Sequence, residues 1–224
     1  YDIGVRLVGS EMCIRDRNIP RGQRPNMYDN SIFVPTAVRW PGHIAPGTVL
    51  DLPVSNLDWY PTLLKLAGIK LPKGETIRGR DISGTLLGEK TDWPDVCYGE
   101  YSTHHQSKTH MRMIRTTNWK LVRDFLNPER DELFDLKNDP AESRNVIAAK
   151  KNAAVVKELH GMIVDRMREA SAEINAAGLT VGTFAGTPEA ARRWIDAGVR
   201  YISLSVDTGI YLEGCRRMIS ETRG

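Results

Sequence analysis

Cysteine and histidine, which can act as nucleophiles or metal ligands, are few in this sequence: it has three cysteines and five histidines. Its three cysteines form no CxxC pair and are Cys13, Cys97 and Cys215. The sequence therefore predicts neither a disulfide framework nor a zinc site built on thiolates. The histidines gather once, in THHQSKTH, but the irregular spacing of His104, His105 and His110 does not define a zinc site, and Cys97 is too far upstream to complete one. This stretch is typical of a surface loop.

Composition and charge exclude several classes of protein. The 224 residues are 41% hydrophobic and 26% charged, which are ordinary globular values and argue against disorder or collagen-like repeats. Lys and Arg exceed Asp and Glu by 31 to 28, and because the excess is spread along the chain, it favours no nucleic-acid partner. No apolar stretch approaches the ~20 residues of a membrane span. The length suits one domain or two small ones.

Residues 1–17 differ in character from the rest. They lack the continuous apolar region and the small-residue cleavage site of a signal peptide, and they show no clear period of 2 or 3.6. The stretch 8–17, VGSEMCIRDR, resembles a translated sequencing-adapter artefact that recurs at the ends of metagenomic open reading frames. The alternative is a natural strand and loop. We expect residues 1–17 to lie outside the fold and the native N-terminal part to be missing.

The secondary-structure elements that would position functional side chains begin after residue 17. Eleven of the twelve prolines lie within the first 140 residues, which indicates many turns and short elements. The β-branched stretch 31–40 predicts a strand in which Pro35 forces a bulge or an edge position. Residues 55–68 predict a helix capped by Ser55 or Asp58. Leu57, Leu64 and Ala67 line one face, with Leu63 beside it, so we expect this apolar side to pack against another element and be buried.

A second group of elements is regular. Residues 111–117 and 119–125 alternate with period 2 on either side of a short turn, and residues 132–136 supply a third strand, so we expect an antiparallel meander. Residues 150–177 predict a long helix that ends at Gly178. Its apolar stripe is Val155, Leu159, Met162, Ile163 and Met167.

Six blocks of this region occur in the order found in the C-terminal half of sulfatases. They are MYDNS (27–31), VPTAVRWPG (34–42), Asp58 with PTLLKLAGI (61–69), GRDISGTLLG (79–88), MIRTTNWKLV (113–122) and ELFDLKNDPAESRNV (132–146). Residues 18–171 therefore resemble a sulfatase C-terminal region. The resemblance implies an alkaline-phosphatase-like α/β fold, of which this region would hold an α+β part, a small antiparallel sheet against a C-terminal helix.

The resemblance implies hydrolysis of sulfate esters. Sulfatases use a formylglycine nucleophile made from Cys or Ser in the pattern C/S-x-P-S-R, and a bound divalent cation, usually calcium, that neutralises the sulfate oxygens. No cysteine or serine here stands in that pattern, and the paired aspartates that hold the cation are absent. Asp29-Asn30 resembles a further metal-binding pair, but it falls inside the MYDNS block, so we expect turn or strand-edge residues. We expect this chain to hold no catalytic residue and no metal, to bind no cofactor and to be inactive alone.

The resemblance also implies contacts with a sulfated substrate. A lysine that binds sulfate usually precedes the MYDNS block, where this sequence has Arg21 and Arg24. The alternative for these two is a solvated basic loop. Sulfatases place substrate-selecting residues in the loop that holds His104 and His105, and these could hydrogen-bond a sulfate or a sugar. The candidate substrate-binding residues are thus Arg21, Arg24, His104 and His105.

From residue 172 the pattern changes to alternating strands and helices. Residues 179–185 and 199–207 are near-continuous apolar strands, each followed by a helix, and Thr187-Pro188 is a typical helix start. This βαβα unit resembles the seventh and eighth strands of the TIM-type barrel of the HpcH/HpaI aldolase family. The Glu and Asp that hold that family's divalent metal belong to earlier strands and are absent. Two strands cannot close a barrel, so the tail must dock on the rest or remain loosely packed.

These observations predict three segments: an artefact-like stretch over 1–17, a sulfatase C-terminal region over 18–171, and an aldolase-like C-terminal fragment over 172–224. The leading hypothesis is a fragment of a sulfatase that acts on a sulfated small molecule or carbohydrate. The alternatives are a metal-dependent aldolase or lyase that cleaves a pyruvate-type carbon–carbon bond, and a non-catalytic module that binds sulfated sugars. Many bacterial sulfatases are periplasmic or secreted, but the segment that would carry an export signal is missing, so localisation and oligomeric state stay open.

Overall fold

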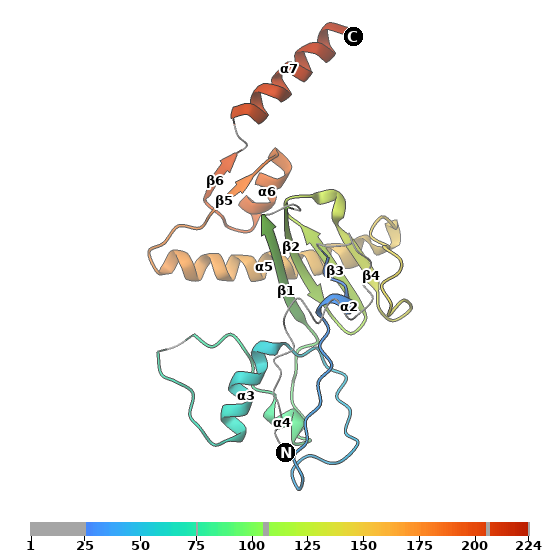
Figure 1. Ribbon diagram of the computed structural model, residues 1–224, viewed down its shortest axis with the longest axis vertical. Helices are drawn as coiled ribbons and strands as arrows, with labels where there is room; N and C mark the ends of the chain where they lie inside the picture. Colours follow the sequence, from blue (N-terminus) through green and yellow to red (C-terminus); the bar gives the residue numbers. More distant parts are fainter. Residues whose placement is uncertain (1–25, 75, 105–107, 205–206, 224) are drawn as a thin grey trace.

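The computed structural model describes residues 26–74, 76–104, 108–204 and 207–223 (Figure 1). This part of the chain forms a four-stranded antiparallel sheet, a long helix across it, an irregular region with short helices, and a two-stranded parallel sheet. The expectation for residues 1–17 falls outside the described residues. Among the described helices, none is both long enough and apolar enough to cross a membrane.

The central sheet is a meander in which sequence neighbours pair in opposite directions. Its strands are β1 (Cys97–His104), β2 (Lys108–Arg115), β3 (Trp119–Asp124) and β4 (Glu132–Asp135), in the order β1-β2-β3-β4. Ile114 lies opposite Leu121, and Leu121 lies opposite Leu133, so apolar residues align across three strands. The predicted three-stranded meander is confirmed, and β1 adds a fourth strand. The surface loop predicted over residues 103–110 is wrong in its described part, because residues 103–104 end β1 and residues 108–110 begin β2.

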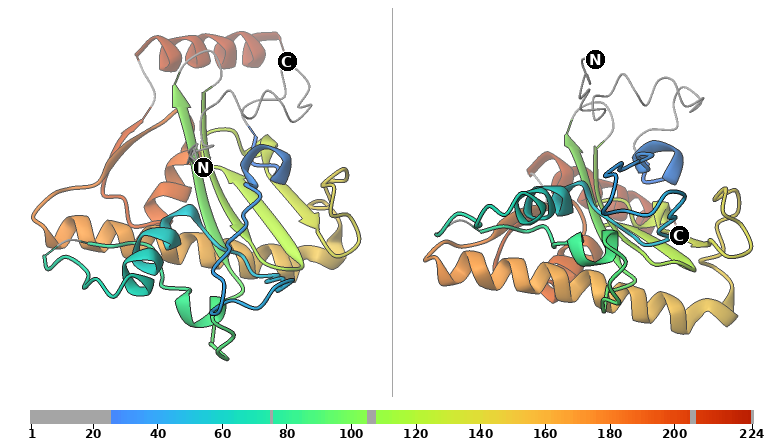
Figure 2. Two further views of the ribbon diagram at one scale, coloured as in Figure 1. Left: turned by 60° about the horizontal axis from the view of Figure 1, so that its bottom comes forward. Right: turned by 90° about the horizontal axis from the view of Figure 1, so that it is seen from below.

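Helix α5 (Ala153–Ala176) lies across one face of this sheet (Figure 2). The core between them contains Leu159, Ile163 and Met167 of the helix and Ile114, Leu121 and Leu133 of the strands. The opposite face of the sheet carries a smaller apolar cluster of Met27, Met111, Met113 and Val122. The predicted long helix is confirmed: the 3-10 turn η3 (Lys150–Asn152) leads into α5, and Gly178 follows it with a φ of 78°, a conformation that suits glycine.

The region before the sheet contains only short helices. They are α2 (Asp29–Ile32), η1 (Asn56–Asp58), α3 (Trp59–Leu66) and α4 (Ser83–Leu86), and a further turn, η2 (Pro128–Arg130), joins β3 to β4. The predicted strand over residues 31–40 is wrong, because its first two residues end α2 and residues 33–40 form no strand. Phe33 and Val38 are 59% and 40% exposed, so the β-branched and aromatic side chains of this segment are not buried as in a sheet.

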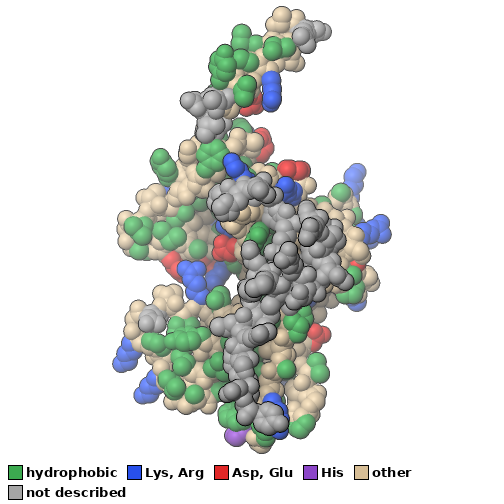
Figure 3. Space-filling view, in the orientation of Figure 1, with side chains coloured by type: hydrophobic (Ala, Val, Ile, Leu, Met, Phe, Trp, Pro, Cys, Tyr) green, Lys and Arg blue, Asp and Glu red, His purple; other side chains and the backbone are tan. Residues whose placement is uncertain are grey.

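The predicted helix over residues 55–68 is present as η1 and α3, but it buries a different side. Ser55, one of the two predicted caps, caps its start, and together with Asp58 it forms a capping box. None of the four apolar residues predicted to be buried is buried: Leu57 and Leu63 are 59% and 58% exposed, and hydrophobic side chains gather on the surface around α3 (Figure 3). Polar contacts hold the other side, where the buried Asp58 carboxylate accepts the backbone N–H of Arg80 at 2.7 Å.

The C-terminal part has the predicted βαβα order. Its elements are β5 (Gly182–Ala185), α6 (Pro188–Asp196), β6 (Tyr201–Leu204) and α7 (Asp207–Arg223), and β5 pairs with β6 in parallel. Ala185, Trp194 and Val199 share the core of the central sheet and α5, so this unit docks on the rest, whereas α7 extends away from it (Figure 1). The change of sequence pattern predicts a segment boundary between residues 171 and 172. Helix α5 runs through this position without a break.

Candidate functional site

The predicted substrate-binding residues fall at the margins of the described structure. Three of them lie outside the described residues: Arg21, Arg24 and His105. His104 ends β1 with its backbone opposite Lys108, and its side chain is also outside the described part. His110, the third histidine of the stretch, has its Nδ1 3.2 Å from Ser102 Oγ. The contacts of Arg21, Arg24, His104 and His105 with a substrate therefore stay predictions.

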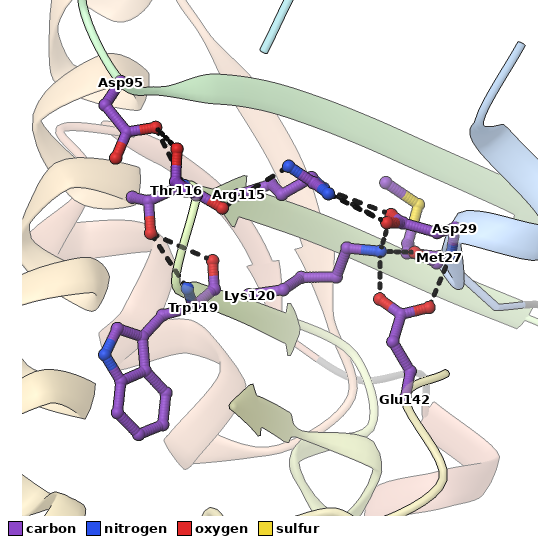
Figure 4. Close-up of polar contacts among 9 residues, drawn as sticks. Met27, Asp29, Asp95, Arg115, Thr116, Trp119, Lys120 and Glu142 are labelled. Atoms are coloured by element: carbon purple, nitrogen blue, oxygen red, sulfur yellow. Dashed lines mark hydrogen bonds and ion pairs between the residues drawn. The ribbon is translucent and has the colours of Figure 1, made fainter. Parts of the chain in front are cut away.

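A cluster of four charged side chains joins three distant parts of the chain, and we call it the anchor cluster: Asp29, Arg115, Lys120 and Glu142 (Figure 4). The fully buried Lys120 is at its centre. Its Nζ donates to Asp29 Oδ1 at 2.5 Å, to the Met27 carbonyl at 3.0 Å and to the Glu142 carboxylate. Arg115 supplies a second cation, with Nη2 3.1 Å from Asp29 Oδ2. Burial of a lysine is costly unless the ammonium is paired, and here two carboxylates and a carbonyl pair with it.

The backbone brings these side chains together in two ways. Arg115 and Lys120 lie opposite each other in the register of β2 and β3, so both point to the face that carries α2. Glu142 has a φ of 54°, a left-handed conformation that is uncommon for a residue other than glycine. In that conformation its carboxylate contacts Lys120 and also accepts the backbone N–H of Asp29 at 2.5 Å, which ties α2 to the turn after β4. These contacts offset the backbone strain, which typically costs about 1–3 kcal/mol.

Tyr28 adds a further contact between the MYDNS block and the sheet. Its hydroxyl donates to Glu132 Oε1 at 2.9 Å, and its ring packs edge-on against Phe134 with 5.8 Å between centroids. Burial and the nearby Glu132 carboxylate raise the pKa of Tyr28 to about 12, so the phenol stays a donor at neutral pH. Burial also raises the pKa of Glu132, although the hydrogen bond from Tyr28 opposes that shift.

The two carboxylates of the anchor cluster differ in how well they are compensated. Burial raises the pKa of Asp29, but Lys120 and Arg115 together outweigh burial, so the pKa lies below its usual value. For Glu142 burial outweighs Lys120, so the pKa lies above its usual value. Asp29 accepts hydrogen bonds from cations on both of its oxygens. The cluster is therefore suited to hold the MYDNS block on the sheet, and it offers no free nucleophile.

The described residues do not form a site for the divalent cation that the sulfatase resemblance implies. In that part of the chain no group of three or more His, Cys, Asp or Glu side chains is arranged to hold a metal ion. The Asp29 carboxylate is already engaged by two cationic side chains, and Asn30 is exposed, so this pair does not fit a hard cation that needs several free oxygen ligands. Asp29-Asn30, predicted to be turn or strand-edge residues, lie in the four-residue helix α2 and not at the edge of a strand.

A second buried polar centre lies at the far end of β3. The Asp124 carboxylate is fully buried and accepts five hydrogen bonds, from Thr109 Oγ1, Asn127 Nδ2 and the backbone N–H groups of His110, Leu126 and Asn127. Nearby, Asp131 Oδ2 pairs with Arg123 and with Arg193, each at 3.1 Å. Arg193 belongs to α6, so this centre joins the C-terminal unit to the sheet.

Neither centre is predicted from the sequence. One indication was available, because Lys120 lies two residues before Val122 and so on the same face of β3. If that face is covered, the lysine ammonium is buried and requires a carboxylate partner. The sequence does not indicate which carboxylate pairs with Lys120, because Asp29 is separated from it by 91 residues.

Comparison with known proteins identifies the class that this arrangement belongs to. Residues 23–169 match the family described as "N-sulphoglucosamine sulphohydrolase, C-terminal". The match covers more than half of the chain and includes the four-stranded sheet, most of α5 and the whole anchor cluster. The chain therefore belongs to this family of sulfatase C-terminal domains, and its small antiparallel sheet with helices is part of a sulfatase-like α/β fold.

Individual relatives are similar to parts of this chain. Steryl-sulfatase of Rattus norvegicus is 47% identical over 70 residues, which are 31% of this chain and 12% of the relative. N-acetylglucosamine-6-O-sulfatase of Bacteroides thetaiotaomicron is 30% identical over 149 residues, 64% of this chain and 26% of the relative. The solved structure of a 2-O GAG sulfatase is 26% identical, with a TM-score of 0.45, and covers 53% of this chain and 26% of that chain. The chain thus spans about a quarter or less of the length of these relatives.

Proposed function

We propose that this chain is the C-terminal part of a sulfatase that hydrolyses the sulfate ester of a small molecule or carbohydrate. The family match over residues 23–169 carries this proposal. The anchor cluster supports it, because its carboxylates and its lysine come from three of the blocks that resemble sulfatases: MYDNS, MIRTTNWKLV and ELFDLKNDPAESRNV. The three blocks thus contact one another in the fold through ion pairs, which explains why they contain an aspartate, a lysine and a glutamate at these positions.

The anchor cluster would serve the active site by fixing the start of the MYDNS block. Arg24 stands three residues before Met27, whose carbonyl is bound by Lys120. Because three residues of extended chain reach at most about 11 Å, an anchored Met27 limits the positions open to Arg24. We propose that Arg24, with Arg21, takes the place of the lysine that contacts sulfate in this family, and that His104 and His105 contact the rest of the substrate. Arginine suits a tetrahedral anion because its guanidinium can donate two parallel hydrogen bonds.

The formylglycine nucleophile and the divalent cation belong to other parts of the enzyme. No Cys or Ser of the 224 residues stands in the pattern C/S-x-P-S-R, and the described residues do not fit a divalent cation. When bound, such a cation would neutralise the sulfate oxygens. The residues of this chain would bind and orient the sulfated substrate. A sulfated sugar is the favoured class, because one relative is named for N-acetylglucosamine-6-O-sulfate hydrolysis.

An assay of the full chain with an aryl sulfate and with glucosamine 6-sulfate tests this division of roles. We expect no hydrolysis with or without calcium, because the nucleophile lies elsewhere. Robust calcium-dependent hydrolysis by this chain would overturn the proposal. Saturable binding of glucosamine 6-sulfate without cleavage, lost in the double variant Arg21→Ala/Arg24→Ala, would support the assigned contacts and also the alternative of a non-catalytic binding module.

For residues 172–224 we propose an origin in an aldolase-like fragment of the HpcH/HpaI type. The parallel pairing of β5 with β6 around α6 supports it, because this is the repeating unit of a TIM-type barrel. Two strands do not close a barrel, so we expect no retro-aldol release of pyruvate by this chain. Pyruvate release in a coupled lactate dehydrogenase assay would favour the alternative of a metal-dependent aldolase or lyase.

A further inference from the structure

Helix α6 presents a compact face to the central sheet and α5. Thr187 caps its start by accepting the N–H of Ala190 at 3.2 Å, and Pro188 occupies the first turn. Its buried side chains are Ala190, Ala191 and Trp194, with 1%, 9% and 7% exposure. The two alanines allow close approach, and the tryptophan supplies most of the apolar contact area.

Trp194 contacts the outer ends of β2 and β3. Its ring lies 5.0 Å from the ring of Phe125 and 5.9 Å, edge-on, from that of His110. The Arg112 guanidinium lies over the same ring, 5.9 Å from its centroid. Arg112 also donates to Ser102 Oγ at 3.2 Å, so the contact with α6 continues to β1.

Arg193, the neighbour of Trp194, makes the polar half of the contact. Its Nη1 donates to the Asp124 carbonyl at 3.1 Å, and its Nη2 pairs with Asp131. The Asp124 carboxylate in turn binds Thr109 Oγ1 and the N–H of His110 at the end of β2. Two adjacent residues of α6 therefore contact, directly or through Asp124, the same end of the β1–β2 hairpin.

We propose that α6 supports the outer end of the β1–β2 hairpin, and that Trp194 is a positioning residue for this end. The hairpin end means the strand residues 100–104 and 108–112. Its functional meaning rests on the proposed function, in which His104 contacts a sulfated substrate. Helix α6 lies after residue 171, beyond the family match, so residues outside the sulfatase domain would determine how rigid the hairpin end with His104 is.

Amide hydrogen exchange on the full chain, at pH 7 without substrate, tests the proposal. In Trp194→Ala we expect amides of residues 108–112 and 100–104 to exchange at least tenfold faster, which corresponds to about 1.4 kcal/mol of local opening free energy. Amides of β3 and β4 near Leu121 and Leu133 should change less than threefold, because α5 covers them. Trp194→Phe should restore exchange to near the native rate, since it keeps an aromatic ring over Phe125.

Ile195→Ala is the matched control, because Ile195 is the next residue of α6 and is 59% exposed. It should leave exchange unchanged. Unchanged exchange at the hairpin end of Trp194→Ala, or an equal increase over the whole sheet, would overturn the proposal. If Trp194→Ala does not fold, Arg193→Gln should show the same local pattern at smaller size, and a uniform or absent change there would also overturn it. Since no substrate is used, failure here is distinct from failure of the sulfatase proposal.

Discussion

Replacing Lys120 with methionine removes the central cation of the anchor cluster while keeping most of its volume. The lysine side chain is fully buried, and its ammonium holds Asp29, Glu142 and the Met27 carbonyl. After the substitution Asp29 keeps Arg115, but Glu142, whose carboxylate side chain is 3% exposed, loses its cation. Removing one partner of a buried ion pair typically costs about 3–5 kcal/mol. We expect Lys120→Met to lower the free energy of unfolding by about that amount.

Two comparisons separate this cause from a general effect of substitution. Arg115→Met removes the cation whose side chain is 29% exposed, and because solvent screens such a pair, we expect a loss of about 1 kcal/mol or less. The double variant Lys120→Met/Glu142→Gln also removes the charge that the single variant leaves unpaired, and the amide oxygen of the glutamine can still accept the N–H of Asp29. Most of the cost of breaking a buried ion pair comes from the charge left unpaired, so the double variant should be more stable than Lys120→Met by more than about 1 kcal/mol.

Urea unfolding at pH 7, followed by circular dichroism, measures these differences. A loss below about 1 kcal/mol for Lys120→Met, or a loss equal to that of Arg115→Met, would refute the assignment of Lys120 as the central contact. A double variant less stable than the single one would refute the argument from the unpaired Glu142.

Three further predictions concern Asp124, His160 and Gly79. Burial raises the pKa of Asp124, but the hydrogen bonds from Thr109 and its other donors outweigh burial, so the pKa lies below its usual value. The ionised carboxylate therefore stabilises the fold above about pH 4, and this stabilisation is lost as pH falls. In urea unfolding, Asp124→Asn should cost about 2–3 kcal/mol at pH 7 and progressively less toward pH 2. Burial, with Arg123 and Arg193 nearby, lowers the pKa of His160, so the folded state favours neutral imidazole and loses stability as pH falls below about 6.5. His160→Gln should therefore lose less stability than the native chain between pH 7.5 and 5.5, and an equal loss would contradict this reasoning. Gly79→Ala would place a Cβ 1.8 Å from the Leu57 carbonyl oxygen, so thermal unfolding should reveal a loss of at least about 2 kcal/mol, whereas Gly161→Ala, with open space around it, should not destabilise.

Elements with a local cause were predictable. The β2–β3–β4 meander follows from period-2 alternation, and α5 follows from an apolar stripe closed by Gly178. The start at Ser55 follows from a capping box that involves only residues three positions apart. Each of these depends on neighbours in sequence, which is why the sequence alone was sufficient.

Elements that depend on a distant partner were not predictable. Residues 31–40 have the composition of a strand, but strand formation needs a neighbouring strand, and the described structure pairs none with them. Leu57 and Leu63 were assigned to a buried face, yet the helix is fixed through Asp58. Lys120 meets Asp29 across 91 residues, and only the fold shows this pairing. The substrate contacts of Arg21, Arg24, His104 and His105 remain predictions.

The most direct test of the sulfatase assignment is the nucleotide sequence immediately upstream of the codon for Asn18 in the source genome. If this chain is the C-terminal part of a sulfatase, an in-frame upstream region should encode the pattern C/S-x-P-S-R, whose Cys or Ser becomes formylglycine. An uninterrupted upstream frame long enough to match the length of the relatives, but without that pattern, would contradict the assignment.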